Sequence, residues 1–189
     1  MIPAPIRNPD SRPRRGNLGW LRFLTVFTLL LCGFYAAALL PLGQRAFYNY
    51  LRANAWISNA ILRGLGQDTY LSGVTIRSNQ FAIAIRRGCD ALEPAWFFCA
   101  AVLAFPVPWR RKRLVLAGGV TIILVLNLVR IVSLYFVGMR MPGFFETAHL
   151  ELWPAAFMLT VLLLWISWIR SSVAAEKAIA FRRIPGSPE

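Results

Sequence analysis

Histidine and cysteine are scarce in this chain, which has one histidine, His149, and three cysteines, Cys32, Cys89 and Cys99. Structural zinc sites need about four closely spaced Cys or His ligands, and the sequence has no Cys-x-x-Cys pair or Cys/His cluster. Cys32 and Cys99 lie within apolar runs, where a cysteine usually behaves as a small hydrophobic residue. The lack of ligands argues against a metal centre, and we expect no cofactor.

Acidic residues are also few, with 8 Asp and Glu against 21 Lys and Arg, and only 15% of the chain is charged. With 57% hydrophobic residues the chain is too apolar for an ordinary soluble domain, which indicates an integral membrane protein. The net charge of +13 would suit a nucleic acid, but the basic residues flank apolar runs instead of forming one face. We therefore expect membrane lipids with anionic head groups as partners, and no nucleic acid.

Four apolar runs predict membrane spans, at residues 20–40, 91–109, 114–138 and 150–169. A helix needs about 20 apolar residues to cross a hydrocarbon core about 30 Å thick, and each run is near that length. The first run has a rival interpretation as a secretory signal peptide, because Ala36 to Ala38 resemble a cleavage site. Against that interpretation, the run is longer than the usual core of a signal peptide.

Basic residues predict how these spans are oriented, because cytoplasmic loops are enriched in Lys and Arg. An Arg-Arg-Lys-Arg run at 110–113 separates the second span from the third, and basic tails at 1–19 and 170–189 flank the membrane domain at 20–169. If these three segments are cytoplasmic, both termini lie inside, and the loops at 41–90 and 139–149 face outward.

The long outer loop at 41–90 predicts two elements of its own. Residues 46–66 mix apolar and polar side chains at helical spacing, which is typical of an interfacial amphipathic helix, and Gly64 and Gly66 end it. Its expected apolar face comprises Phe47, Tyr50, Ala53 or Asn54, Ile57 and Ile61. Further along, alternation at 74–77 and 81–85 around a polar turn predicts a β-hairpin that leads into Cys89.

These elements together define the expected fold. It is an all-α integral membrane protein with about four transmembrane helices, an extracytoplasmic amphipathic helix and a short β-hairpin.

Arg130 is the most unusual residue of the third predicted span. A charge deep in a span costs about 2.5–3.5 kcal/mol on insertion scales, and such residues usually face the interior of the helix bundle. At about 1.5 Å per residue, Arg130 lies about 24 Å above Leu114, in the outer leaflet. Asn127 shares its helix face. A structural alternative is an arginine that extends to the outer head groups or pairs with an acid such as Glu93.

Cys89 and His149 map to the same depth as Arg130, at the outer ends of the second and fourth spans. Taken singly, Cys89 is most simply interpreted as an inert thiol, and His149 as a boundary residue at the membrane interface. Together the three residues form a chemical set: a thiol nucleophile, a histidine that exchanges protons near neutral pH, and an arginine that stabilises an oxyanion. This set predicts acyl transfer through a thioester.

Charged neighbours of Cys89 are candidates for supporting roles. Arg87 and the Arg130 guanidinium are expected to lower the pKa of the thiol. Asp90 and Glu93 either orient His149 or Arg130, or cap the second span, whose Pro94 suits a first helical turn. Capping is the favoured interpretation for Glu93, and the role of Asp90 stays open.

Three segments in this order resemble the exosortase and archaeosortase family of membrane cysteine transpeptidases, in particular the short type called exosortase H. They are RRGCDALE at 86–93, NLVRIVSL at 127–134, which fits an Asn-x-x-Arg-Ile pattern, and HLELWPAAF at 149–157. The resemblance implies Cys89, Arg130 and His149 as catalytic residues. The chain departs from many members at Asp90-Ala91, where they have Ser-Gly, at Pro154, and in having about half as many spans.

The resemblance also implies a substrate and a location. The substrate would be a secreted protein whose C-terminal tail has a short motif similar to Ile-Pro-Thr-Leu, one transmembrane helix and a basic end. The enzyme would lie in the inner membrane of a bacterium, with its active site facing the periplasm.

Two other functions are compatible with the same residues. In the first, the protein is a non-enzymatic assembly factor or transporter subunit, and Arg130 is structural. In the second, it is an acyltransferase that acts on a lipid or glycan and does not depend on a protein tail.

Overall fold

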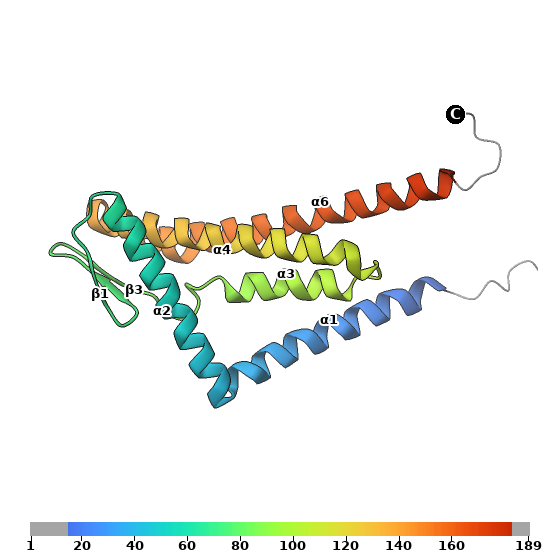
Figure 1. Cartoon of the computed structure of the whole chain (residues 1–189), viewed down its shortest axis with the longest axis horizontal. Helices are drawn as coiled ribbons and strands as arrows, with labels where there is room; N and C mark the ends of the chain where they lie inside the picture. The colour runs from blue at the N-terminus through green and yellow to red at the C-terminus, as the bar shows by residue number, and fades with distance from the viewer. Residues whose placement is uncertain (1–14, 183–189) are drawn as a thin grey trace, which may run out of the picture.

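Long helices and a small sheet are arranged so that the sheet lies at one end of a helix bundle (Figure 1). A computed structural model describes the backbone of residues 15–182 and the side chains of residues 19–172. Residues 1–14 of the first predicted basic tail and 183–189 of the second lie outside the described residues, and α6 continues as helix past residue 170. The elements in order are α1 Arg15–Leu39, α2 Pro41–Gly64, β1 Tyr70–Ser72, β2 Thr75–Arg77, β3 Ala82–Ala84, α3 Leu92–Ala104, α4 Trp109–Arg140, the 3-10 turn Pro142–Phe144, α5 Phe145–Thr147, the π-helical segment Ala148–Leu152 and α6 Trp153–Arg182.

Three stretches of the described chain are long and apolar enough to cross a membrane: Gly19–Leu39, Trp109–Arg140 and Pro142–Ser172. They correspond to the first, third and fourth predicted spans. The predicted span at 91–109 is instead α3, a helix of 13 residues and about 20 Å. The prediction of four spans is therefore not confirmed, because α3 alone is shorter than the hydrocarbon core of a bilayer.

Local chemistry explains why α3 is short. At its start, an Asp90 side-chain oxygen accepts a hydrogen bond from the backbone N–H of Leu92 at 2.8 Å, which caps the helix. At its end, Pro106 and Pro108 prevent the helix from continuing. The Lys112 ammonium donates to the carbonyl of Leu103 at 2.7 Å and satisfies one of the terminal carbonyls.

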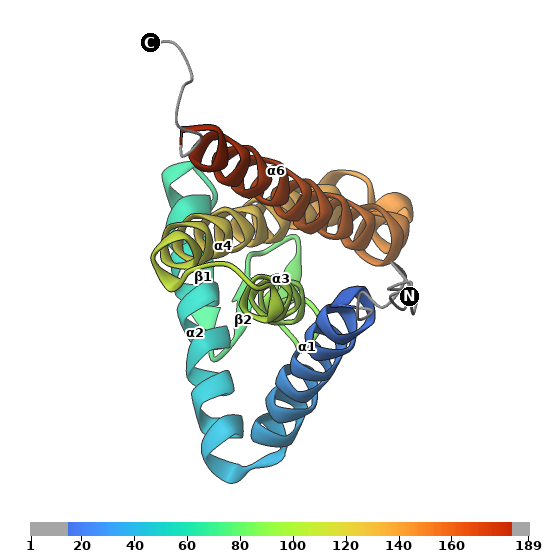
Figure 2. The same cartoon turned by 90° about the vertical axis from the view of Figure 1, so that its right-hand side faces the viewer.

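Despite its length, α3 occupies the middle of the bundle, surrounded by α1, α2, α4 and α6 (Figure 2). It contacts α1, α4 and α6. Phe98 of α3 is fully buried and packs where Gly119 of α4 leaves room, since a Cβ at that position would overlap the phenyl ring. This close approach fixes the middle of α3 against the first third of α4.

The predicted amphipathic helix is confirmed as α2, but it begins earlier, at Pro41, and only part of its expected apolar face packs on protein. Its buried residues are Leu51, Asn54, Ala55, Ser58 and Leu62. Ile57 and Ile61, which belong to the expected apolar face, are 38% and 37% exposed. In a helix beside a bilayer, apolar side chains can face lipid, so hydrophobic spacing did not mark the side that packs on protein.

The predicted β-hairpin is also confirmed, with β2 and β3 antiparallel and Ile76 opposite Ile83. The Ser78 hydroxyl accepts hydrogen bonds from the backbone N–H groups of Gln80 and Phe81, which closes the turn. A third strand, β1, pairs with β2 and was not predicted, so the sheet has the order β1-β2-β3. Buried Ile76, Ile83 and Ile85 anchor the sheet to α2 and α4.

Candidate active site

Cys89, Arg130 and His149 come together although they lie on three different elements. Cys89 is in the loop between β3 and α3, Arg130 is on α4, and His149 is in the π-helical segment before α6. The Cys89 Sγ lies 3.5 Å from His149 Nε2 and 3.7 Å from His149 Nδ1. Arg130 Nη2 lies 3.8 Å from the same sulfur. A nucleophile, a proton acceptor and a fixed positive charge therefore share one small volume.

The Arg130 guanidinium is buried, with only 4% of the residue exposed, and it holds several groups at once. Nη1 donates to the carbonyl of Gly88 at 3.2 Å, and Nη2 donates to the carbonyl of His149 at 3.4 Å. The guanidinium carbon also lies 5.6 Å from the centre of the Phe157 ring, in cation–π range. These contacts tie the Cys89 loop to the His149 segment across α4.

Two neighbours contact the His149 ring beside the sulfur. Phe145 stacks on the imidazole with ring centres 5.8 Å apart and an interplanar angle of 13°. Arg130 Nη2 lies 3.5 Å from His149 Nδ1. Because a guanidinium has only donors, this contact requires an unprotonated Nδ1, and the neutral ring then carries its proton on Nε2. In that tautomer the donor nitrogens Nε2 and Nη2 lie 3.5 and 3.8 Å from the sulfur.

The loop that presents Cys89 is shaped by Asp90. Its carboxylate is buried and accepts hydrogen bonds from the backbone N–H groups of Gly88 at 3.1 Å and of Leu92. Gly88 has φ +88° and Ala91 has φ +58°, so two residues of this short loop adopt left-handed conformations. Asp90 therefore holds a tight turn on both sides of Cys89 and accepts a hydrogen bond from the first N–H group of α3.

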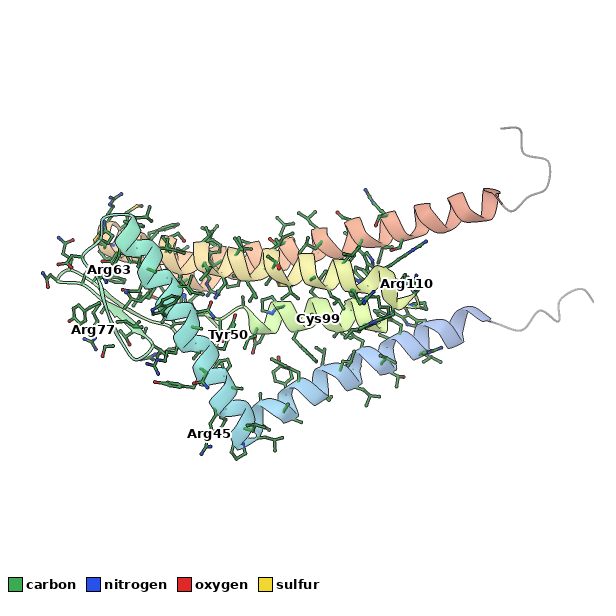
Figure 3. The ribbon with its side chains drawn as sticks, in the orientation of Figure 1. Arg45, Tyr50, Arg63, Arg77, Cys99 and Arg110 are labelled. Carbon is green, nitrogen blue, oxygen red and sulfur yellow. The ribbon has the colours of Figure 1, made fainter. Side chains whose placement is uncertain are left out.

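Tyr50 on α2, labelled in Figure 3, secures the same loop from the other side. Its hydroxyl donates to the backbone carbonyl of Asp90 at 2.6 Å. Burial raises the pKa of Tyr50, so the hydroxyl stays protonated and keeps its role as donor. Burial also raises the pKa of the Asp90 carboxyl, although its two backbone hydrogen bonds favour the charged form. Through Tyr50, α2 contributes to the position of Cys89.

Two cavities open beside these side chains, and Arg130 lines both. The larger, about 1090 Å³, is lined mainly by apolar residues of α1, α3 and α6 and extends to Gly88 and Arg130. The smaller, about 430 Å³, is lined by Cys89, His149 and residues of β3. Within the described residues, no group of three or more His, Cys, Asp or Glu side chains is arranged to hold a metal ion.

One known protein family matches most of the chain. A family model described as transmembrane exosortase matches residues 17–166. The chain belongs to this family. No curated protein and no solved structure matches this exosortase significantly. Family membership together with the apolar helices makes the protein an integral membrane protein of a class of protein-sorting enzymes.

The supporting residues predicted for this exosortase take other positions. Glu93 is exposed in the first turn of α3, and capping, expected of Glu93, is performed by Asp90. In the part of the chain that the structure describes, no ion pair joins Glu93 to Arg130. The Arg87 guanidinium lies over the Phe47 ring at 4.7 Å, and Arg87 shares the smaller cavity with Cys89.

Asn127 lies one turn from Arg130 but serves a different contact. It is fully buried and its amide donates to the Asn54 side chain of α2 at 3.2 Å. Among the described residues no hydrogen bond joins Asn127 to Cys89, Arg130 or His149. In this exosortase Asn127 therefore joins α4 to α2.

Sequence reasoning missed the groups that brace the three residues: Tyr50, the Gly88 carbonyl, Phe145 and Phe157. Tyr50 was predicted only as part of an amphipathic face. Nothing in the local sequence distinguishes an aromatic residue that supports a site from one that only packs. These contacts join segments far apart in the sequence, for example Tyr50 and Asp90. A sequence pattern does not reveal such pairings.

The acidity of the Cys89 thiol differs from the expectation. Positive neighbours were expected to lower its pKa, but burial raises the pKa above its ordinary value, and Arg130 offsets only part of the rise. Arg86 and Arg87 are exposed, so water screens their charges. The Cys89 thiol is therefore mostly protonated near neutral pH.

We expect the alkylation of Cys89 to have a high-pH midpoint. Because only the thiolate reacts and burial raises the pKa of this thiol, the rate should rise with pH to a midpoint above the ordinary value of about 8.5. The measurement is the rate of modification by a polar maleimide in the Cys32→Ser, Cys99→Ser background, where Cys89 is the remaining thiol. A midpoint below about 8 would contradict the prediction.

Proposed function

We propose that this exosortase is a cysteine transpeptidase that cleaves the C-terminal sorting tail of secreted proteins through a thioester on Cys89. The observation on which the proposal rests is the convergence of His149 and Arg130 on the Cys89 sulfur, at 3.5 and 3.8 Å. A nucleophile, a base within reach and a fixed cation are the groups that acyl transfer needs.

In the first half of the reaction, the thiol proton moves to the unprotonated nitrogen of His149, and the sulfur attacks the carbonyl carbon of the tail. Both ring nitrogens lie within 3.7 Å of Sγ, so the ring need not turn to accept the proton. Protonation of Nδ1 removes the acceptor of Arg130 Nη2, which is then free to donate to the oxyanion or the sulfur. When the C–N bond breaks, the imidazolium returns its proton to the leaving nitrogen, and the thioester remains.

In the second half, water or an amine attacks the thioester. His149 takes the proton of the attacking group, the C–S bond breaks, and the released thiolate recovers a proton from the ring. The acyl group leaves either as a carboxylic acid or as a new amide. Neither half needs a metal or an organic cofactor in this scheme.

The larger cavity supports a membrane-embedded tail as the substrate. Its walls include Phe27 and Phe34 of α1, Phe97 of α3, and Met158 and Leu162 of α6. A cylinder about 10 Å wide, the size of an α-helix, fills about 1090 Å³ over about 14 Å, or about nine residues. An apolar helix seated there would place the chain just above it beside Arg130 and Cys89. The resemblance to exosortase H favours a motif similar to Ile-Pro-Thr-Leu at that point.

Charge placement supports the proposed orientation in a bacterial inner membrane. Arg110, at the start of the basic 110–113 run, lies at the end of the bundle opposite the sheet (Figure 3). With this run in the cytoplasm, the sheet and Cys89 face the periplasm. Arg63 and Arg77 lie at the sheet end, on a long loop, where the rule that cytoplasmic loops are positive is weaker.

The alternative is a non-enzymatic protein in which Arg130 is structural, and that alternative gives Cys89 no chemical role. Arg130 does brace the fold, through the carbonyls of Gly88 and His149. Bracing alone does not require a thiol at 3.5 Å from an imidazole. The proximity of Cys89 and His149 therefore favours the enzyme.

Detection of the thioester tests the proposed function. The purified full-length protein, in nanodiscs of phosphatidylethanolamine and phosphatidylglycerol, is mixed with a synthetic peptide and quenched in acid. The peptide has an Ile-Pro-Thr-Leu segment, an apolar helix of about 20 residues and an arginine end. We expect a mass adduct on the Cys89 peptide, equal to the N-terminal fragment of the substrate and released by hydroxylamine. Cleavage without an adduct at Cys89 would refute the thioester route.

A further inference from the structure

The sheet leaves one of its edges without a partner strand. Its order is β1-β2-β3, so β3 pairs with β2 on one side and with no other strand of the described chain on the other. An unpaired edge presents a row of backbone N–H and C=O groups that can bind an added strand. β3 consists of Ala82, Ile83 and Ala84, of which Ala82 is exposed, Ile83 is buried and Ala84 is half-buried.

The pairing pattern identifies the groups that point outward. The backbone N–H of Ile85 donates to the carbonyl of Val74, and the carbonyl of Phe81 accepts from the N–H of Ser78. In an antiparallel pair, alternate residues bond to the same neighbour, so residues 81, 83 and 85 face β2. The N–H and C=O groups of Ala82 and Ala84 therefore point to the free edge.

This free edge shares a cavity with the candidate active site. The cavity of about 430 Å³ is lined by Ala82, Ile83 and Ala84 of β3 and by Cys89 and His149. Arg130 lines this cavity as well as the larger apolar one. A peptide in the smaller cavity would therefore lie beside the sulfur.

We propose that β3 binds the segment of the substrate next to the cleaved bond as a fourth, extended strand. The inference rests on the proposed function, since it assigns a binding site to the substrate of that reaction. Extended peptides bind to free sheet edges through backbone hydrogen bonds, and pockets for alternate side chains give selectivity. Only alternate residues of the bound segment bond to β3, so a proline is accepted at a position that faces away. An Ile-Pro-Thr-Leu segment meets this condition.

Proline at position 84 tests the edge directly. It removes one outward N–H group, and edge strands accept proline where the N–H is not paired with the sheet. The matched control is Leu71→Pro on β1, which removes an outward N–H from the opposite edge, because Tyr70 and Ser72 are the residues of β1 that bond to β2. We expect Ala84→Pro to weaken binding of the peptide described above about tenfold, and Leu71→Pro to weaken it less than threefold.

Binding is measured on the full chain in nanodiscs with Cys89→Ala added, so the result does not depend on cleavage. A photo-crosslinking residue within the Ile-Pro-Thr-Leu segment gives a second measurement that does not depend on how the proline variants fold. We expect crosslinks to residues 81–85. Crosslinks confined to other elements, or equal binding by Ala84→Pro and the parent, would overturn the inference. If crosslinks reach β3 but the enzyme with Cys89 forms no thioester, the proposed reaction fails and not the binding site.

Discussion

Replacing Cys89 by alanine is expected to abolish tail processing while leaving the folded protein intact. The sulfur is the group that forms the covalent bond, and no other thiol is near: Cys32 is exposed on α1, and Cys99 lies two to three turns along α3. Loss of a nucleophile costs as much as loss of the whole catalytic set, which in comparable enzymes is about 10⁶-fold in kcat. We therefore expect activity at or below the detection limit, a loss of at least about 10³-fold.

The measurement is the amount of cleaved tail after co-expression with a tail-bearing substrate, normalised to the amount of folded protein in the membrane. Cys99→Ala is the matched control, because it makes the same substitution at a half-buried thiol of the neighbouring helix. We expect Cys99→Ala to retain most of the activity. Processing by Cys89→Ala at the level of the parent would refute the enzyme and favour the assembly factor or transporter subunit.

Arg130→Lys is expected to have the second-largest effect, although it keeps the positive charge. The guanidinium contacts the Gly88 carbonyl, the His149 carbonyl and the Cys89 sulfur with two nitrogens of one rigid plane. An ammonium is a single point and cannot hold these three groups together. Loss of one oxyanion donor costs about 10²–10³ in kcat, and we expect a loss of this size.

The substitution is evaluated by kcat and KM on the synthetic tail peptide, with the folded yield as a separate readout. Arg140→Lys is the control, because Arg140 is exposed at the end of the same helix and lies over the Phe136 ring, away from the site. We expect Arg140→Lys to be within about twofold of the parent. If Arg130→Lys kept kcat within threefold and lowered only the yield, Arg130 would be structural.

Most of the membrane architecture could be predicted from hydropathy, because length and apolarity are properties of a local segment. The hairpin was predictable for the same reason, since alternation and a Ser-Asn turn are local. The length of α3 could not be predicted in this way, because residues 91–109 are continuously apolar. Its true ends depend on Asp90 at the start and on the proline pair and Lys112 at the end. Hydropathy averages over such features.

The proximity of the three site residues was predicted from depth alone, and the structure places them in contact. Their catalytic roles stay a prediction. What depth could not provide is the set of contacts that position them, since Tyr50 reaches Asp90 across 40 residues of sequence and Arg130 reaches Gly88 across 42. The pKa of Cys89 was misjudged for a related reason: charge is visible in a sequence, whereas burial depends on the packing of distant segments.

Arg130 lines both cavities, the one of about 430 Å³ beside Cys89 and the apolar one of about 1090 Å³. A smaller side chain at this position would enlarge both cavities at once and would leave more room for water or lipid around the sulfur. The size of residue 130, as well as its charge, therefore sets how much space surrounds Cys89.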